Sequence, residues 1–194
     1  MPGVGAIVLA AGSSSRMGRP KQLLRVQGKT LLRRAAETAA EAGCAPIVVV
    51  LREMSDELLA ELRGLAVHPI ESPEAAKGIG TSIRAGVGSI LHHLPTLQSL
   101  VILLCDQPRV NADMLRRLID SHRASGKPVS ACAFAGTIGP PVLLESALFS
   151  RFQSLKDDQG AKALWLAQPE IVHRFACEEA AIDVDTPEDY QRLG

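Results

Sequence analysis

Four runs of apolar residues, each about the length of a strand, recur along the chain. They read GAIVLA at 5–10, PIVVVL at 46–51, SLVILLC at 99–105 and PVSACAF at 128–134. The runs are rich in Val, Ile and Leu and do not alternate strictly with polar residues, which is typical of strands covered on both faces. They therefore predict a buried sheet with further structure packed on each side.

Amphipathic segments separate these runs. LLRRAAETAAEAG at 31–43 ends at a glycine, which is a common helix stop, and SDELLAELRG at 55–64 begins at a serine and ends at a glycine. Residues 80–94 and 112–124 predict two further helices, the second with Asn111 as its N-cap. Strands that alternate with helices predict right-handed βαβ units around a mainly parallel sheet, the α/β fold class.

The regular alternation of strand and helix patterns ends after the fourth apolar run. A turn rich in Gly and Pro leads to the short run VLL, to helices near 145–153 and 160–167, and to strand-like segments at 171–176 and 181–184. Thr186 is expected to cap a last helix, with proline at its first position and acids in its first turn. This half of the chain is expected to extend the sheet and to cover one edge.

Length and composition bound the domain count and the class. A chain of 194 residues can bury a sizeable core, and no disordered linker or internal repeat divides it, so we expect a single domain over residues 1–194. Lys plus Arg and Asp plus Glu balance at 21 each, which gives no overall attraction for nucleic acid or an anionic membrane. No run approaches the roughly 20 apolar residues of a membrane span, and no signal peptide is evident.

The cysteines support a cytoplasmic location. They lie far apart, without the spacing of zinc ligands, and are expected to be buried thiols in a reducing cytosol. The four positions are Cys44, Cys105, Cys132 and Cys177.

The segment after the first apolar run is strongly basic. Residues 16–34 include seven basic side chains and no acid. In an open α/β sheet, ligands bind beyond the carboxyl ends of the strands, where Gly12 lets the backbone approach them closely. Arg16 and Lys21 are therefore candidates for charge-assisted hydrogen bonds to a polyphosphate. The other arginines of the segment are interpreted as a solvated basic face: Arg25, Arg33 and Arg34.

Two well-known phosphate loops are absent. GKT at 28–30 resembles the end of a P-loop, but that motif requires glycine where this chain has Leu23. The dinucleotide fingerprint GxGxxG is missing as well, because three serines and Arg16 follow Gly12. The basic loop is therefore of a different kind.

Acidic residues follow the third apolar run and recur near the C-terminus. Asp106, at the carboxyl end of a central strand, could hold a divalent cation such as Mg²⁺ against phosphate oxygens, or alternatively stabilise the turn. Asp183 and Asp185 lie two residues apart on an expected strand and share a face, so one of them could complete a metal site with Asp106. The remaining acids are interpreted as a solvated face and helix caps: Glu178, Glu179, Glu188 and Asp189.

These motifs resemble a known family. LAAGSSSRMGRPKQLL at 9–24 matches the LAAGxSxRMGxPKxLL signature of the MobA-like nucleotidyltransferases, and the chain is most similar to the molybdenum cofactor cytidylyltransferase branch. Further matching segments cover nearly the whole chain: GIGTSIRAG at 78–86, CDQP at 105–108, GPPVLL at 139–144, DDQGAKAL at 157–164 and DVDTPEDY at 183–190. The resemblance implies a three-layer, Rossmann-like α/β fold with a nucleotide-binding half to about residue 110 and an acceptor-binding half after it.

The resemblance also implies roles for individual residues. Arg16 and Lys21 would bind the triphosphate and act in catalysis together with Asp106. Mg²⁺ would be held by Asp106 and Asp185, with Asp183 as the less favoured ligand. The backbone that holds base and phosphates would be that of Leu9, Ala10, Ala11 and Gly12. The residues lining the nucleotide pocket would be Thr81, Ser82 and Arg84.

The reaction implied is transfer of CMP from CTP to the terminal phosphate of a molybdopterin-type acceptor, with release of pyrophosphate. Ala11 favours CTP over another NTP, because in this family alanine at that position goes with cytosine and glycine with guanine. The resemblance also implies a molybdoenzyme as a partner. The chain departs from the family's GHP and GDxGAR patterns at Pro140 and Lys162, which removes a donor and a planar cationic fork. The alternatives are a sugar phosphate or methylerythritol phosphate acceptor, and a non-catalytic cofactor-binding chaperone.

Overall fold

The computed structural model describes residues 3–12, 18, 20–162 and 168–193. Arg16 and most of the helix expected at 160–167 lie outside these residues. In the described part of the chain, none of the helices has the length and apolar character needed to span a bilayer.

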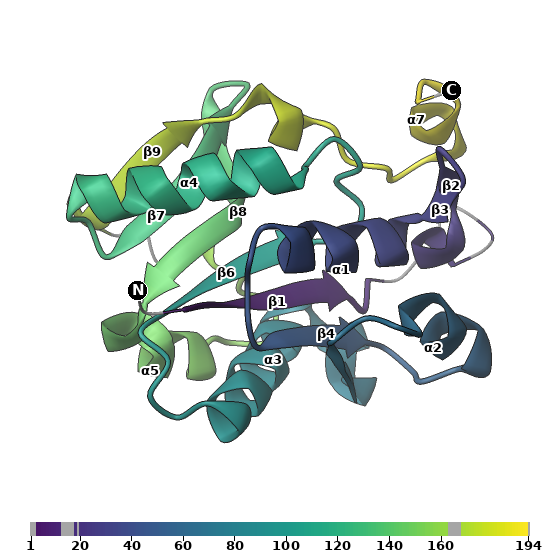
Figure 1. Ribbon diagram of the computed structural model, residues 1–194, viewed down its shortest axis with the longest axis horizontal. Coiled ribbons are helices and arrows are strands. Elements are labelled where there is room, and N and C mark those ends of the chain that lie inside the picture. Colours follow the sequence, from purple (N-terminus) through teal and green to yellow (C-terminus); the bar gives the residue numbers. More distant parts are fainter. Residues whose placement is uncertain (1–2, 13–17, 19, 163–167, 194) are drawn as a thin grey trace.

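A seven-stranded sheet forms the middle layer, in the order β5-β4-β1-β6-β8-β7-β9 (Figure 1). The strands are β1 (Val4–Ala10), β4 (Ile47–Leu51), β5 (His68–Glu71), β6 (Ser99–Leu104), β7 (Val129–Phe134), β8 (Thr137–Glu145) and β9 (Val172–Ala176). All neighbours are parallel except β8, which runs antiparallel to β6 and β7. The mainly parallel α/β fold is confirmed.

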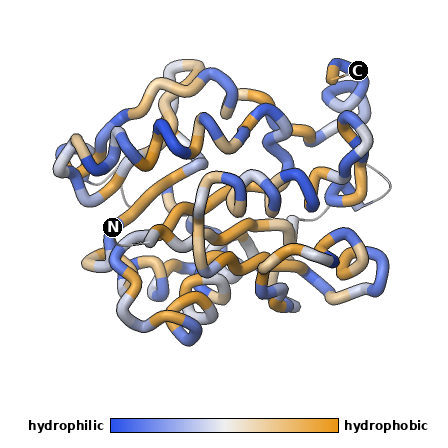
Figure 2. The backbone as a smooth tube through the Cα atoms, viewed as in Figure 1, coloured by the Kyte–Doolittle hydropathy of each residue, from blue (hydrophilic) through white to orange (hydrophobic). Residues whose placement is uncertain are grey.

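The central strands are covered on both faces. Every residue of β1 and of β4 is buried, and hydrophobic colours concentrate along these strands in Figure 2. Because successive side chains point to opposite faces, Val8 and Ala10 of β1 enter one core cluster, whereas Ile7 and Leu9 enter the other. Two separate hydrophobic cores therefore hold the layers together.

Helices supply the two outer layers. The face that includes Val8 packs against α1 (Leu31–Glu41), α2 (Asp56–Leu62) and α4 (Ala112–Ser125), and the opposite face packs against α3 (Ile79–His93) and α5 (Phe149–Gln153). The expected caps are present, since the Ser55 side chain accepts from the Leu58 amide and the Asn111 side chain from the Met114 amide. The last helix, α7 (Pro187–Gln191), begins with a capping box at Thr186.

Strand β8 is longer than the sequence pattern predicts. Only VLL was expected to be apolar strand, but the strand includes Pro140 and Pro141, which central strands normally exclude. The ladder to β7 shifts between Ala131 and Cys132, and the ladder to β6 begins only at Val142, so neither proline faces a paired neighbour. This irregularity places the prolines where no ladder hydrogen bond is lost.

Other differences concern short elements. The expected strand at 181–184 is wrong: a 3₁₀ turn occupies Glu178–Ala181, and the residues after it pair with no strand of the sheet among the described residues. The edge strand β5 and the two-stranded ribbon of β2 (Arg25–Val26) and β3 (Lys29–Thr30) were not predicted. The carboxyl ends of β1 and β4 point toward this ribbon and α7 (Figure 1).

Candidate active site

Gln22, which follows the loop after β1, is hydrogen-bonded to the backbone at the start of that loop. Its amide Nε2 donates to the carbonyl oxygens of Ala10, at 2.6 Å, and Gly12, at 3.2 Å. Gln22 lies in a short 3₁₀ helix (Lys21–Leu23), and its side chain is buried. The neighbouring Lys21 is therefore fixed at the carboxyl end of β1.

Asp106 reaches the same edge from β6. The Cys105 amide donates to the Leu9 carbonyl at 3.1 Å, which continues the ladder between β1 and β6 up to the residue before Asp106. The Val184 amide donates to the backbone carbonyl of Asp106 at 2.9 Å. This bond brings the C-terminal segment, with Asp185, alongside the end of β6.

Lys21 lies between two carboxylates. Its ammonium donates to Oδ2 of Asp106 and, at 3.1 Å, to Oδ1 of Asp185. The side chains of Lys21 and Asp106 are 11% and 15% exposed, whereas that of Asp185 is 54% exposed. Burial alone would lower the pKa of Lys21, but the charge and hydrogen bonds of Asp106 and Asp185 raise it above its ordinary value. Lys21 therefore stays protonated at neutral pH.

Asp183 is a third carboxyl group at this edge. Burial, the charge of Asp106 and the charge of Asp185 raise the pKa of Asp183 to about 6, although a hydrogen bond from Gln107 and the charge of Lys21 oppose the shift. Three carboxyl groups thus converge near one ammonium among the described residues. The edge has an excess of negative charge that a further cation would relieve.

The donor set fits a divalent cation that is shared with a ligand. Oδ1 of Asp106 is buried and has no hydrogen-bond partner among the described residues, so the lone pairs of this oxygen are not satisfied by the protein. The described residues form no cluster of three or more His, Cys, Asp or Glu side chains arranged for a metal. Mg²⁺ is usually held by one or two carboxylates and completed by water and substrate phosphates, which matches this arrangement.

Thr81 and Arg84, predicted on α3 to line the nucleotide pocket, make their hydrogen bonds to residues other than Lys21 and Asp106. The hydroxyl of Thr81 donates to the Gly78 carbonyl at 2.7 Å, and Ser82 is buried. The guanidinium of Arg84 donates to the carbonyl of Leu155 and, at 2.5 Å, to Oδ1 of Asp157. These side chains hold the α3 terminus and the segment around residue 157, and their role toward a nucleotide stays a prediction.

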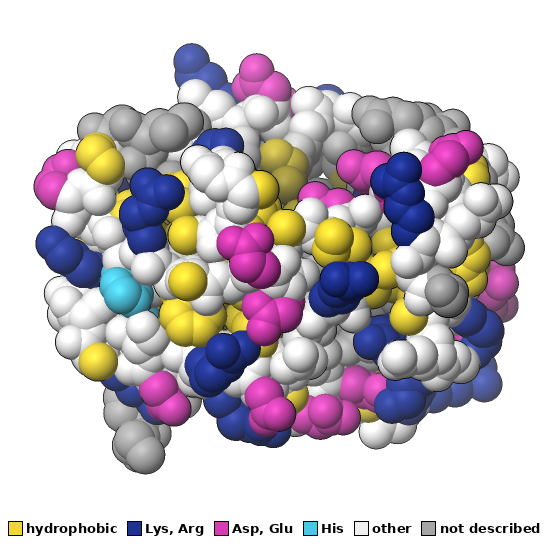
Figure 3. All heavy atoms as spheres, turned by 90° about the horizontal axis from the view of Figure 1, so that it is seen from above, with side chains coloured by type: hydrophobic (Ala, Val, Ile, Leu, Met, Phe, Trp, Pro, Cys, Tyr) yellow, Lys and Arg dark blue, Asp and Glu magenta, His cyan; other side chains and the backbone are white. Residues whose placement is uncertain are grey.

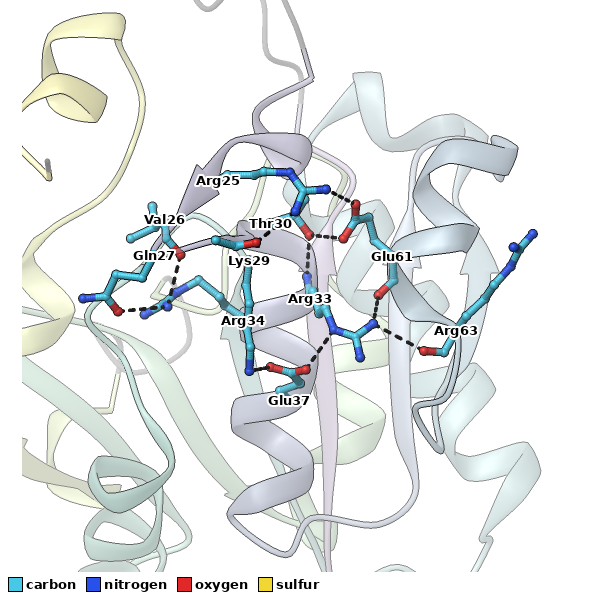
Figure 4. A network of polar contacts seen from close by, with 11 residues as sticks. Arg25, Val26, Gln27, Lys29, Thr30, Arg33, Arg34, Glu37, Glu61 and Arg63 are labelled. Atoms are coloured by element: carbon cyan, nitrogen blue, oxygen red, sulfur yellow. Dashed lines mark hydrogen bonds and ion pairs between the residues drawn. The ribbon is translucent and has the colours of Figure 1, made fainter.

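Arg25, Lys29 and Arg33 form ion pairs within the protein, whereas the half-buried Arg34 donates to the carbonyls of Pro108, at 3.0 Å, and Val26, at 3.4 Å, and is therefore not a solvated residue (Figure 4). Arg25 pairs with Glu61 at 2.9 Å, and Lys29 and Arg33 pair with Glu37 at 2.6 and 2.8 Å. These contacts join the ribbon to α1 and α2, and their neutralised charges agree with a surface role. On the face shown in Figure 3, described Lys and Arg side chains are likewise interspersed with Asp and Glu.

A hollow of about 480 Å³, lined by both polar and apolar residues, lies beside the first loop on the side of α2. Its lining includes Ala10, Gly12 and Gln22 from the loop region and Arg52 and Ser55 from the segment after β4. Of the loop positions predicted to hold a nucleotide, Ala10 and Gly12 border this hollow. Leu9 instead faces the opposite side of the sheet, as the strand period requires.

Two buried glutamines complete the site, and the sequence analysis did not identify them. Gln107 donates from Nε2 to the carbonyls of Ala180, at 2.9 Å, and Pro140, at 3.3 Å. It therefore ties the segment after β6 to the second half of the chain, as Gln22 ties the first loop. Their adjacency to Lys21 and Asp106 in the motifs PKQLL and CDQP was the available signal.

A mainly parallel sheet with a cation and carboxylates at the carboxyl ends of its central strands is typical of enzymes that bind phosphorylated ligands. The model of the MobA-like NTP transferase domain matches residues 6–172. The chain belongs to this family of nucleotidyltransferases, and the resemblance that its motifs predict is confirmed.

Relatives match over almost the full length. Nicotine blue oxidoreductase from Paenarthrobacter nicotinovorans is 30% identical over 204 residues, which cover 100% of this chain and 97% of the relative. The crystal structure of Rv0371c from Mycobacterium tuberculosis H37Rv has a TM-score of 0.81 at 31% identity, covering 98% of this chain and 97% of that one. A complex of Rv0371c with manganese has a TM-score of 0.78 at 29% identity over the same shares.

Proposed function

We propose that the chain transfers CMP from CTP to the terminal phosphate of a molybdopterin-type acceptor and releases pyrophosphate. The observation that carries the proposal is the contact of Lys21 with Asp106 and Asp185 at the carboxyl ends of β1 and β6. Family membership supports nucleotidyl transfer, and the motifs at both ends of the chain favour this acceptor.

Lys21 would act by electrostatic stabilisation. In attack on the α-phosphorus, charge accumulates on the α-phosphoryl oxygens and on the departing pyrophosphate. A protonated, largely buried ammonium that is already held in place stabilises such charge without reorganising. The acceptor phosphate is already anionic, so its attack requires no general base, and the proposed attack is direct, with pyrophosphate as the leaving group and without a covalent intermediate. Arg16 is proposed to act on the same triphosphate.

Asp106 and Asp185 would hold the divalent metal. When bound there, Mg²⁺ would neutralise phosphate oxygens and assist departure of pyrophosphate. The unpartnered Oδ1 of Asp106 supports this role, and the manganese complex of Rv0371c supports a divalent metal in a related protein. Before the substrate binds, Lys21 screens the two carboxylates from each other.

The hollow beside the first loop is proposed to receive the nucleotide. It borders Ala10 and Gly12, and it adjoins the Gln22 contact that fixes Lys21. Ala11 supports cytosine as the base, through the family correlation of alanine with CTP. The volume of the hollow, about 480 Å³, is in the range of small-molecule sites.

The test is a panel of nucleotides and acceptors. The purified chain is incubated with Mg²⁺, one of CTP, GTP or ATP, and one of molybdenum cofactor, a sugar 1-phosphate or methylerythritol phosphate. We expect pyrophosphate and a cytidylylated product only with CTP and molybdenum cofactor. Turnover with another acceptor would replace the proposed substrate, and no pyrophosphate with any pair would support a non-catalytic cofactor-binding role.

The name of the P. nicotinovorans relative favours a second candidate, an oxidoreductase. The same protein is therefore incubated with NADH or NADPH and an electron-accepting dye, without a nucleoside triphosphate. Dye reduction that requires the protein would support this candidate, whereas pyrophosphate release in the first panel supports the transferase.

A further inference from the structure

Arg34, near the start of α1, lies against the turn that follows β6. Its side chain is half-buried, and the Nε atom of its guanidinium is fully buried. Together with Cys105, Gln107 and Pro108 it lines a small cavity beside the end of β6. The side chain is therefore directed into the protein, toward the segment that carries Asp106.

This guanidinium bonds two segments that are far apart in the sequence. Nη2 donates to the Pro108 carbonyl at 3.0 Å. Nη1 donates to the Val26 carbonyl and to Oε1 of Gln27, both at 3.4 Å (Figure 4). Pro108 lies in the turn that carries Asp106, and Val26 lies in the ribbon that follows the 3₁₀ helix of Lys21. One side chain thus joins the segments of both members of the central ion pair.

The ribbon of β2 and β3 is joined to the other site segments as well. The Leu24 amide donates to the Lys21 carbonyl at 3.0 Å, which holds the start of the ribbon on the 3₁₀ helix. The hydroxyl of Tyr190, in α7, donates to the Arg25 carbonyl at 2.7 Å, and α7 follows Asp185 in the chain. A side chain that holds the ribbon therefore acts on the segments of both Lys21 and Asp185.

The hydrogen-bond acceptors of Arg34 carry no formal charge. Arg25, Lys29 and Arg33 pair with glutamates, whereas carbonyl and amide oxygens accept from Arg34 in the described part of the chain. Burying part of a cation without a counter-ion is unfavourable. What arginine supplies here is its planar fork, which holds donors in two fixed directions at once. A lysine ammonium has the same charge but no such fork.

We propose that Arg34 is a positioning residue for the reaction. Its guanidinium fixes the turn of Asp106 against the ribbon, and thereby sets the place of the Asp106 carboxylate relative to Lys21 and Asp185. This inference rests on the proposed function, because Arg34 acts on the metal and the triphosphate only through those three side chains. A displacement of about 1 Å at such a group can lower the rate by about 100-fold.

Amide hydrogen exchange tests the positioning without metal or nucleotide. The Val184 amide donates to the Asp106 carbonyl, so its exchange rate reports whether the turn stays in place. In Arg34→Met this amide should exchange about tenfold faster, while the amides of β1 keep their wild-type rates. The control is Arg33→Met, because Arg33 donates to backbone carbonyls at the end of α2 instead. In that variant the Val184 amide should exchange as in the wild type.

Kinetics of the transfer reaction then test the consequence for catalysis. In Arg34→Met, kcat should fall about tenfold and the Mg²⁺ concentration for half-maximal activity should rise about fivefold, because Asp106 is misplaced. The KM for the acceptor should stay unchanged, since the contacts of Arg34 lie in the expected nucleotide-binding half. Arg34→Lys keeps the charge but cannot reach both carbonyls, so it should show the same changes to a smaller degree. Arg33→Met should match the wild type in all three values.

Four results would overturn the positioning role. The first two are an unchanged rate for the Val184 amide in Arg34→Met, and equal acceleration of the β1 amides, which would indicate a general loss of stability. The third is unchanged kcat and Mg²⁺ requirement despite faster exchange. The fourth is wild-type behaviour of Arg34→Lys beside a defect in Arg34→Met, which would assign the effect to charge alone.

The two variants and the two measurements keep the outcomes separate. If Arg34→Met does not fold, exchange and kinetics are measured in Arg34→Lys, where a smaller change in the same direction supports the role and wild-type values overturn it. If the wild type transfers no nucleotide with any pair of substrates, the proposed function fails. Exchange of the Val184 amide then decides by itself whether Arg34 positions the turn of Asp106.

Discussion

The ammonium of Lys21 donates to the carboxylate of Asp106, 85 residues further along the chain, at the edge where β1 and β6 end. Both side chains are largely buried, so their interaction is screened less by solvent than that of a surface pair. Each of the two residues is followed by a buried glutamine that fixes the local backbone: Gln22 after Lys21 and Gln107 after Asp106.

Lys21→Ala should abolish most of the transferase activity. Removing a preorganised cation from the developing charge is expected to lower kcat by about 100-fold or more. The measurement is pyrophosphate release at saturating CTP, with Lys29→Ala as control because Lys29 pairs with Glu37 on the surface. Unchanged turnover in Lys21→Ala would refute the catalytic assignment.

Asp106→Asn should change the response to metal. The amide keeps the size of the side chain but removes its charge, so the Mg²⁺ concentration for half-maximal activity should rise at least tenfold. Asp185→Asn should act in the same direction, and more strongly than Asp183→Asn. EDTA should stop the wild-type reaction, and Mg²⁺ or Mn²⁺ should restore it.

The control for this series is Asp113→Asn, because Asp113 is an exposed residue of α4. If Asp106→Asn and Asp185→Asn required the same Mg²⁺ concentration as the wild type, these two carboxylates would not be the metal ligands. If Asp183→Asn had the larger effect, the second ligand would be Asp183.

His122 should make stability fall in acid. Burial, and then the charges of His173 and Arg123, lower the pKa of His122 to about 4, from an ordinary value near 6.5. Between these values the unfolded chain binds a proton that the folded protein does not. The contribution of His122 to the free energy of unfolding is therefore fully present above pH 6.5 and is lost as the pH falls toward 4. The loss attributable to His122 is about 2 to 3 kcal/mol.

Urea unfolding of wild type and His122→Gln at several pH values measures this effect. The variant should lose most of the dependence between pH 6.5 and 4, and any stability lost with the Ser130 contact should be the same at every pH. His92→Gln, at an exposed position, should keep the wild-type slope. An identical slope in His122→Gln would show that another group titrates.

Gly80→Ala should disturb the segment around Asp157. The new Cβ would meet the Lys156 carbonyl at 2.0 Å, so the segment must move although alanine favours the helix itself. We expect a loss of stability of about 1 to 3 kcal/mol and a raised acceptor KM.

The matched control is Gly88→Ala on the same helix, where the added Cβ has no neighbour within 4 Å. That variant should be stabilised by up to about 1 kcal/mol, because only helix propensity changes. Equal changes in stability at residues 80 and 88 would indicate that the Lys156 carbonyl does not restrict the side chain at residue 80.

The sequence predicted the sheet well where the strands are central. β1 and β4 are buried on both faces, and such strands leave continuous apolar runs. The meeting of Lys21 with Asp106 also follows from topology, since the carboxyl ends of parallel strands share one edge. The prediction that the four cysteines are buried thiols is also confirmed.

The rest depends on contacts that no local pattern records. β8 carries two prolines because its ladders shift around them, and the segment at 181–184 is held by the Asp106 carbonyl rather than by a strand. Gln22 and Gln107 act through distant backbone carbonyls, so their roles appear only once the chain is folded.

The path of the phosphate label tests the central claim most directly. The protein is given Mg²⁺, molybdenum cofactor and CTP that is labelled at either the α- or the γ-phosphate. We predict that the α label joins the acceptor and that the γ label leaves in pyrophosphate, and that Lys21→Ala slows both by about 100-fold or more. Transfer of the γ label to the acceptor, or no transfer of either label, would contradict it.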